Sequence, residues 1–271
     1  MIPVEDHFED VLEKAISGLG LKIEDLARTT GIQYERIKAL LKGEIDELSL
    51  RALSPVLGLS AVKLINMAHN RWQPNIKLPE RVALYNTPFP VPGYETMTVN
   101  SYLIWSGQIA AAFDTGANAH NLLTEVEKRG LKLESLFITH THLDHVAALS
   151  QIRDAHPKCI LYCPKKELLP GAFALSAGDD LNCGNLQIKA LQTSGHSPGA
   201  LSYIVTDGEL KTAFVGDAIF CLSMGKAPTA YQEALKNNRS HLLSLPEKTI
   251  LCPGHGPVTS VADEKAHNPF F

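Results

Sequence analysis

One short stretch constrains the fold of this chain more than any other. Residues 136–148 read LFITHTHLDHVAA, an apolar run followed by His140, His142, Asp144 and His145. Neutral imidazole and carboxylate groups are good ligands for Zn²⁺ and similar divalent ions. Residues i and i+2 at the end of a strand project to the same side, so His140 and His142 can bind one ion. The turn that follows directs Asp144 and His145 elsewhere, which suits a second ion nearby.

Three further ligand-type residues follow other apolar runs. His196 comes after the run at 186–191, Asp217 after 212–215 and His255 after 250–251. A glycine immediately precedes each of them, which allows the tight backbone that presents a ligand. Together with the first motif they predict a metal site at the rim of a sheet.

The remaining pattern predicts two domains. Residues 1–73 carry apolar residues at spacings of three and four, punctuated by glycines, which predicts a small all-helical domain of about five helices. Residues 74–271 carry short apolar runs typical of strands, with helical stretches at about 119–129, 146–155 and 230–243 among them. This second part is predicted to be an α/β domain with sheets covered by helices. The apolar runs lie at 103–105, 109–113, 136–138, 160–162, 186–191, 203–205, 212–215 and 250–251.

Composition excludes several classes of protein. The formal charge is −4, which argues against a nucleic-acid coat, and no apolar run approaches the roughly 18 residues of a membrane span. The acidic start MIPVEDHFED lacks the features of a secretory signal, and the five cysteines form no C-x-x-C pair. We therefore expect a cytoplasmic protein with reduced thiols, no membrane partner and no cysteine nucleophile.

The motifs HTHLDH, SGHSPG, GD and PGHG, in this order, resemble those of the metallo-β-lactamase superfamily over about residues 75–271. The resemblance implies an αββα sandwich with a dinuclear metal site at one rim. It implies a first ion held by His140, His142 and His196, and a second held by Asp144, His145 and His255. Asp217 would bridge the two ions.

The resemblance also gives roles to two aspartates. Asp114, in the run AFDTG, matches an early strand-end aspartate that supports the ligands without binding an ion. The ions are expected to be Zn²⁺, with iron or manganese as alternatives, and to activate a bridging water for attack on a carbonyl. Asp144 is the expected catalytic residue, because its free oxygen can orient the nucleophile or carry a proton to the leaving group.

Within the superfamily, the hydroxyacylglutathione hydrolase (glyoxalase II)-like group resembles this chain most, through SGHSPG, CPGHGPVT and the closing Asn268-Pro-Phe. Asp217 stands where true β-lactamases have a cysteine, and Phe220 where lactonases typically have a tyrosine. The stretch Ala218–Lys226 replaces the glycine-rich Arg-Asp segment usual in the hydrolases. The resemblance implies a small-molecule thioester or related ester as substrate.

Persulfide dioxygenases are the nearest different chemistry. They share the fold and use a single iron held by the equivalents of His140, His196 and Asp217. Under that alternative the other four candidate ligands would not take part in metal loading.

The N-terminal part resembles a phage-repressor-like helix-turn-helix over residues 8–69, with Gly31 at the turn. The candidate DNA contacts are Gln33, Arg36 and Lys38. Residues 1–73 hold 9 Lys or Arg and 11 Asp or Glu, a net charge of −2, which disfavours binding to phosphates. We therefore favour a module for docking or dimerisation, or a lid beside the active site. The alternative is a DNA-binding regulator whose hydrolase-like domain senses a ligand.

Overall fold

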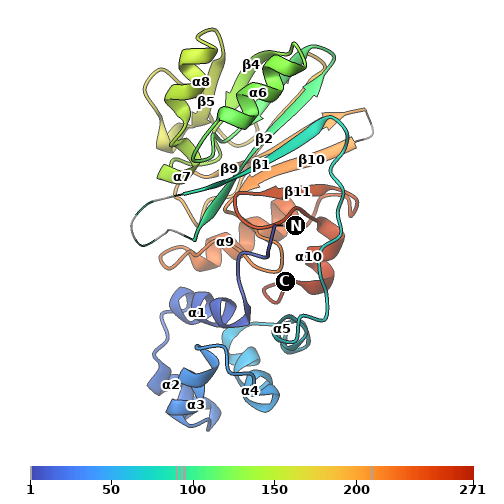
Figure 1. Ribbon diagram of the computed structural model, residues 1–271. Coiled ribbons are helices and arrows are strands. Elements are labelled where there is room, and N and C mark those ends of the chain that lie inside the picture. Colours follow the sequence, from blue (N-terminus) through green and yellow to red (C-terminus); the bar gives the residue numbers. More distant parts are fainter. Residues whose placement is uncertain (1, 90, 92, 94–95, 209) are drawn as a thin grey trace.

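The structure is a computed structural model that describes every residue except 1, 90, 92, 94, 95 and 209. The N-terminal part consists of short helices, as the apolar spacing predicts. They gather at one end of the molecule (Figure 1). The helices are α1 (Phe8–Gly18), α2 (Ile23–Thr30), α3 (Tyr34–Leu40), α4 (Glu47–Leu57) and α5 (Ala61–Ala68).

The rest of the chain forms two mixed six-stranded sheets. The first has the strand order β1-β2-β3-β4-β5-β6 and the second β12-β11-β10-β9-β8-β7. The first sheet contains β1 (Val82–Pro88), β2 (Thr98–Ser106), β3 (Ile109–Phe113), β4 (Lys132–Phe137), β5 (Ile160–Pro164) and β6 (Phe173–Leu175). The second contains β7 (Asp180–Cys183), β8 (Leu186–Gln192), β9 (Leu201–Asp207), β10 (Leu210–Gly216), β11 (Ile250–Pro253) and β12 (Thr259–Ser260).

The two sheets pack face to face through an aromatic core. The rings of Phe113 and Phe214, one from each sheet, stack with centroids 3.8 Å apart, and Phe137 and Tyr203 pack beside them. Such offset and tilted ring pairs stabilise a core beyond simple burial of apolar area. This core sets the distance between the two sheets, and therefore between the loops at their rims.

Helices cover the outer face of each sheet. Leu122 and Ile152 pack on the first sheet, whereas Leu242 and Val261 pack on the second. The predicted αββα sandwich is therefore confirmed. The helical segments are α6 (His120–Lys128), α7 (Leu143–Val146), α8 (Leu149–Ala155), η1 (Lys165–Glu167), α9 (Tyr231–Asn237), η2 (Asn238–Leu242) and α10 (Val261–His267).

The N-terminal helices share a hydrophobic core with the sandwich. Phe8, Val11 and Leu12 of α1 belong to the same buried cluster as Cys221 and Tyr231. At the other side of this contact, Trp72 stacks on His267 of α10 with ring centroids 4.4 Å apart. Among the described residues, none of the helices combines the length and apolar character needed to span a membrane.

Candidate metal centre

The fold brings all seven predicted ligands together at one rim of the sandwich. Each follows the carboxyl end of a strand. His140, His142, Asp144 and His145 come after β4 of the first sheet, the last two in α7, and the other three come after β8, β10 and β11 of the second sheet. Their ligand atoms form overlapping groups within 4.8 Å of one another. The groups are His140, His142 and His196; His140, His145 and Asp217; and Asp144, His145 and His255.

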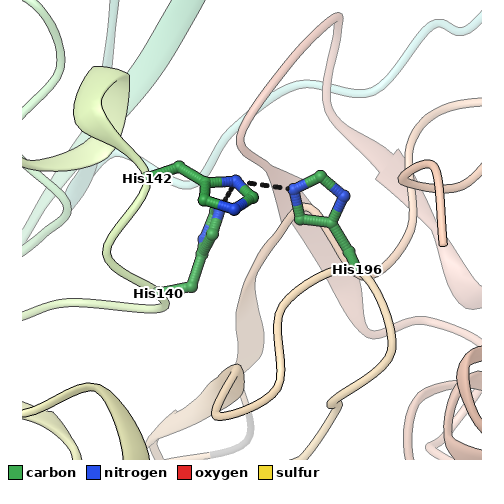
Figure 2. A group of neighbouring side chains, drawn as sticks. All are labelled: His140, His142 and His196. Atoms are coloured by element: carbon green, nitrogen blue, oxygen red, sulfur yellow. Dashed lines mark hydrogen bonds between the residues drawn. The ribbon is translucent and has the colours of Figure 1, made fainter. Parts of the chain in front are cut away.

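Figure 2 shows the group of three histidines, which draws on both sheets. The Nδ1 atom of His142 lies 3.1 Å from Nε2 of His140 and 2.9 Å from Nε2 of His196. In a tetrahedral zinc site with Zn–N bonds of about 2.0–2.1 Å, neighbouring nitrogens lie about 3.3 Å apart. The spacing of these three imidazoles is therefore close to that of ligands around one ion.

Asp217 lies between the three-histidine group and a second group formed by Asp144, His145 and His255. Its Oδ2 atom is 3.4 Å from Nε2 of both His196 and His255, and its Oδ1 atom is 3.2 Å from Nε2 of His145. Asp144 joins the second group through Oδ2, which lies 3.1 Å from Nε2 of His255. This placement is the one that a bridging carboxylate requires.

Hydrogen bonds behind the imidazoles orient their rings. His145 donates from Nδ1 to Asp114 (2.8 Å), His196 to the carbonyl of Lys226 (2.9 Å) and His255 to the carbonyl of Thr98 (2.7 Å). Because these oxygens only accept hydrogen bonds, Nδ1 carries the proton and Nε2 faces the centre. Asp114 also accepts from the amide and hydroxyl of Thr139, so it holds the residue just before the histidine motif.

A further observation indicates that these residues fit divalent cations. Nε2 of His145 and Oδ1 of Asp217 are buried and have no hydrogen-bond partner among the described residues. Buried polar atoms are normally paired, so two such atoms facing each other in a His and Asp cluster indicate a missing positive ligand. Carboxylate and imidazole groups are ligands that Zn²⁺, iron and manganese all bind.

Charges within the centre are strongly coupled. Burial alone would raise the pKa of Asp217, but His255 and His145 outweigh it and hold that pKa well below its usual range. Burial would likewise lower the pKa of His145, yet Asp217 and Asp114 raise it to about 10. Divalent cations would replace the imidazole protons beside Asp217, so metal binding should release protons.

A glycine before one ligand is required by close packing. A Cβ atom on Gly254 would overlap Oδ1 of Asp217 and the ring of His145. No other residue type fits there without displacing both candidate ligands. The glycine that precedes His255 in the sequence therefore has a structural reason.

Exposure within the centre indicates where a substrate approaches. His140, His145 and His255 are at most 4% exposed, whereas His142 is exposed and His196 half-buried. The open side of the centre is therefore the side of His142 and His196.

One residue that no sequence motif marks braces this open side. The Glu167 carboxylate, in η1, accepts from the amide and hydroxyl of Thr141 at 2.8 and 3.0 Å. It also accepts from the Gly199 amide at 2.6 Å and from the hydroxyl of Ser197. Glu167 thus joins the loop that carries His140 and His142 to the loop that carries His196. Burial alone would raise its pKa, but these hydrogen bonds lower it.

The cysteines offer no nucleophile. Burial raises the pKa of the Cys159 thiol to about 12 and that of Cys183 to about 11, and it raises those of Cys163, Cys221 and Cys252 as well. The thiolate is the reactive form of cysteine, so burial disfavours the reactive form of all five residues near neutral pH.

The candidate DNA contacts lie elsewhere, on the turn and helix after Gly31. Arg36 donates to Asp46 at 2.9 Å and pairs with Glu44, and Lys38 pairs with Glu35. The hydrogen bonds from Ser49 and Arg36 lower the pKa of Asp46 to about 2. The charges of Arg36 and Lys38 are thus already matched within the chain.

Comparison with known proteins agrees with this site. The profile described as "Metallo-beta-lactamase superfamily" matches residues 95–255, more than half of the chain. Probable metallo-hydrolase YqgX of Bacillus subtilis is 30% identical over 195 residues, which cover 64% of this chain and 92% of YqgX. Hydroxyacylglutathione hydrolase GloC of Haemophilus influenzae is 30% identical over 197 residues, with the same two coverages.

A solved structure agrees as well. The crystal structure of TTHA1623 in a di-iron-bound form matches with a TM-score of 0.53 at 28% identity, over 65% of this chain and 96% of that chain. The profile match extends from before the first histidine motif to His255. This chain belongs to the metallo-beta-lactamase superfamily.

Proposed function

We propose that this protein is a dinuclear metal-dependent hydrolase that cleaves a thioester or a related ester. The observation that carries the proposal is the position of Asp217, whose two oxygens face imidazoles of both ligand groups. The names of GloC, a hydroxyacylglutathione hydrolase, and of the di-iron form of TTHA1623 support the substrate class and the number of ions. Zinc is the expected metal, with iron and manganese as alternatives.

The site residues divide the work of such a reaction. His140, His142 and His196 would hold one ion, Asp144, His145 and His255 the other, and Asp217 both. Bound there, divalent ions supply Lewis-acid chemistry that lowers the pKa of water and polarises a carbonyl oxygen.

The chain itself provides orientation and proton transfer. Asp114, Thr98 and Lys226 fix the imidazole rings through the hydrogen bonds described above. The pKa of Asp144 is lowered, because hydrogen bonding by His255 and the charge of His145 outweigh the effect of burial. Asp144 is therefore a carboxylate at neutral pH, and the oxygen that does not face His255 can accept the proton of an attacking water and pass it to the leaving group.

The test combines metal analysis with two activity assays on the full chain. We expect two ions per chain and hydrolysis of members of a thioester panel. One iron per chain, with oxygen uptake on a glutathione persulfide and no thioester hydrolysis, would instead establish the dioxygenase alternative and overturn the proposal. Cys159→Ser serves as a matched control, because it leaves the candidate ligands untouched.

A further inference from the structure

The loop that follows Asp217 has two buried faces. Its residues from Ala218 to Gly225 are all buried, including Cys221 and Met224 at no more than 1% exposure. Cys221, Leu222 and Met224 pack in one hydrophobic cluster with α1. The helical module formed by residues 2–73 therefore covers Cys221, Leu222 and Met224, whereas Ala218 and Ile219 pack in the core beside the second sheet.

The opposite face of the same loop contacts the candidate ligands of the second sheet. The carbonyl of Lys226 accepts the hydrogen bond from Nδ1 of His196. Gly225 lies so close to Asp217 that a Cβ atom there would overlap the Asp217 carbonyl and press against the His196 ring. The Phe220 ring meets the His255 ring edge-on, with centroids 5.6 Å apart. The loop thus touches all three ligands that the second sheet supplies.

Lys14 of α1 fastens this loop to the helical module, beside the exposed ion pair between Glu13 of α1 and Lys226. Nζ of Lys14 donates to the carbonyl of Met224 at 2.9 Å, forms an ion pair with Asp6 and lies 5.0 Å from the centre of the Phe220 ring. Its side chain is only 13% exposed. A buried ammonium group is costly unless paired, and here each neighbour is a carboxylate, a carbonyl or an aromatic face.

We propose that the helical module is a structural part of the metal centre and that Lys14 is a positioning residue that connects them. Lys14 holds the carbonyl of Met224, which fixes the turn through Gly225 and Lys226, and this turn holds His196 in its ligand orientation. The inference rests on the proposed metal centre but not on the identity of the substrate. Loss of the Lys14 contact should therefore weaken metal binding through His196.

The experiment uses the full chain with Lys14→Met, which keeps the apolar stem and removes the ammonium. The control is Lys63→Met. Lys63 makes the same kind of contact between the helical module and the sandwich, donating to the main-chain oxygens of Lys265 and Phe271, outside the loop. Zinc affinity is measured by competition with a chelator, and melting temperature is measured on the metal-free proteins.

We expect Lys14→Met to bind the His196-linked zinc about 10- to 100-fold more weakly than Lys63→Met, the range seen when partners behind a metal ligand are removed. Lys14→Gln, which keeps a neutral donor for Met224, should lose less and provides a milder variant should Lys14→Met fold poorly. Equal zinc affinities in the Lys14 and Lys63 variants would overturn the inference. Absence of thioester hydrolysis in the wild type would overturn the proposed function alone, because the zinc measurement requires no substrate.

Discussion

Two buried carboxylates border the loop from Ala218 to Gly225, and their hydrogen-bonding surroundings are opposite. At the metal rim, Asp217 has an oxygen without a hydrogen-bond donor among the described residues and is surrounded by imidazole nitrogens. In α10, Glu264 has both oxygens engaged, by donors from Leu222, Thr259 and Asn268. The first arrangement needs a cation to be complete, whereas the second is complete within the chain.

The helix pair α2 and α3 resembles the Glu264 junction and not the metal rim. Arg36 and Lys38 are already paired with acidic neighbours. Residues that could bind a ligand therefore indicate a binding site most strongly where the fold gathers them and leaves their polar atoms without hydrogen-bond partners.

The largest effect is expected from Asp217→Asn. The amide keeps the size of the side chain but loses its charge and one acceptor, so at least one ion should be lost. We expect kcat/KM for a thioester to fall about a thousandfold, equivalent to several kcal/mol of lost electrostatic stabilisation. Elemental analysis and turnover measure both effects. Asp207→Asn, which removes a surface ion pair with Arg81, is the control. Two retained ions with normal turnover would remove the dinuclear assignment.

The second prediction concerns pH and Glu264. Burial raises its pKa from 4.5 to about 7, so the folded state binds its proton more tightly than the unfolded state does. The resulting stabilisation is fully present below about pH 4.5 and is lost as pH rises through about 7, a change of about 3 kcal/mol. In Glu264→Gln this dependence should vanish. Urea unfolding of metal-free wild type and variant at pH 5 to 8 measures the difference, and a gap that stays constant with pH would contradict the assignment.

A smaller effect is expected from Glu167→Gln, because an amide nitrogen cannot accept the hydrogen bonds that one carboxylate oxygen now receives. The loops carrying His142 and His196 should separate more easily, which should weaken metal binding at the three-histidine group about 10- to 100-fold. The metal affinity can be measured by competition with a chelator, and the ligand geometry by the visible absorption spectrum of the Co²⁺-substituted protein. Glu134→Gln, at an exposed pair with Lys132, is the control and should match the wild type. Identical affinities in both variants would show that Glu167 has no positioning role.

The smallest effect is expected in the helix pair. Because Arg36 and Lys38 are paired and the module carries a net charge of −2, the protein should bind a short DNA duplex no more tightly than the roughly 10⁻⁴–10⁻⁶ M of nonspecific binders. Replacing Gln33, Arg36 and Lys38 together by alanine should leave this binding unchanged in a salt-titrated assay. Sub-micromolar, salt-dependent binding that disappears in the triple variant would establish a DNA reader.

Much of the fold could be predicted from local patterns. The run 109–113 coincides with β3, and the spacing of apolar residues anticipated all of α1 to α5. Two elements that the pattern did not predict bury little: β7 buries only Cys183, and α10 buries only Val261 and Glu264. The predicted helix at 146–155 is divided into α7 and α8, with α7 beginning early enough to carry Asp144 and His145.

The sequence could predict those residues of the site that occur in recognisable motifs. Seven candidate ligands are marked by neighbouring residues, and the fold gathers all of them. Glu167 and Lys14 carry no such mark, because their partners are distant in sequence: Thr141 is 26 residues from Glu167, and Met224 is 210 residues from Lys14. Such residues become visible only when tertiary structure places the two segments side by side.

The division of the candidate ligands between the two sheets has a thermodynamic consequence. An ion held by His140 and His196 at once is a cross-link between halves of the chain that unfolding would separate. Since the unfolded chain offers no such preformed site, free metal ions raise the free energy of unfolding by mass action, by about 4 kcal/mol at a thousand times the dissociation constant. The metal site would then cross-link the two sheets as well as support a reaction. The free energy of unfolding of the sandwich would depend on the free metal concentration.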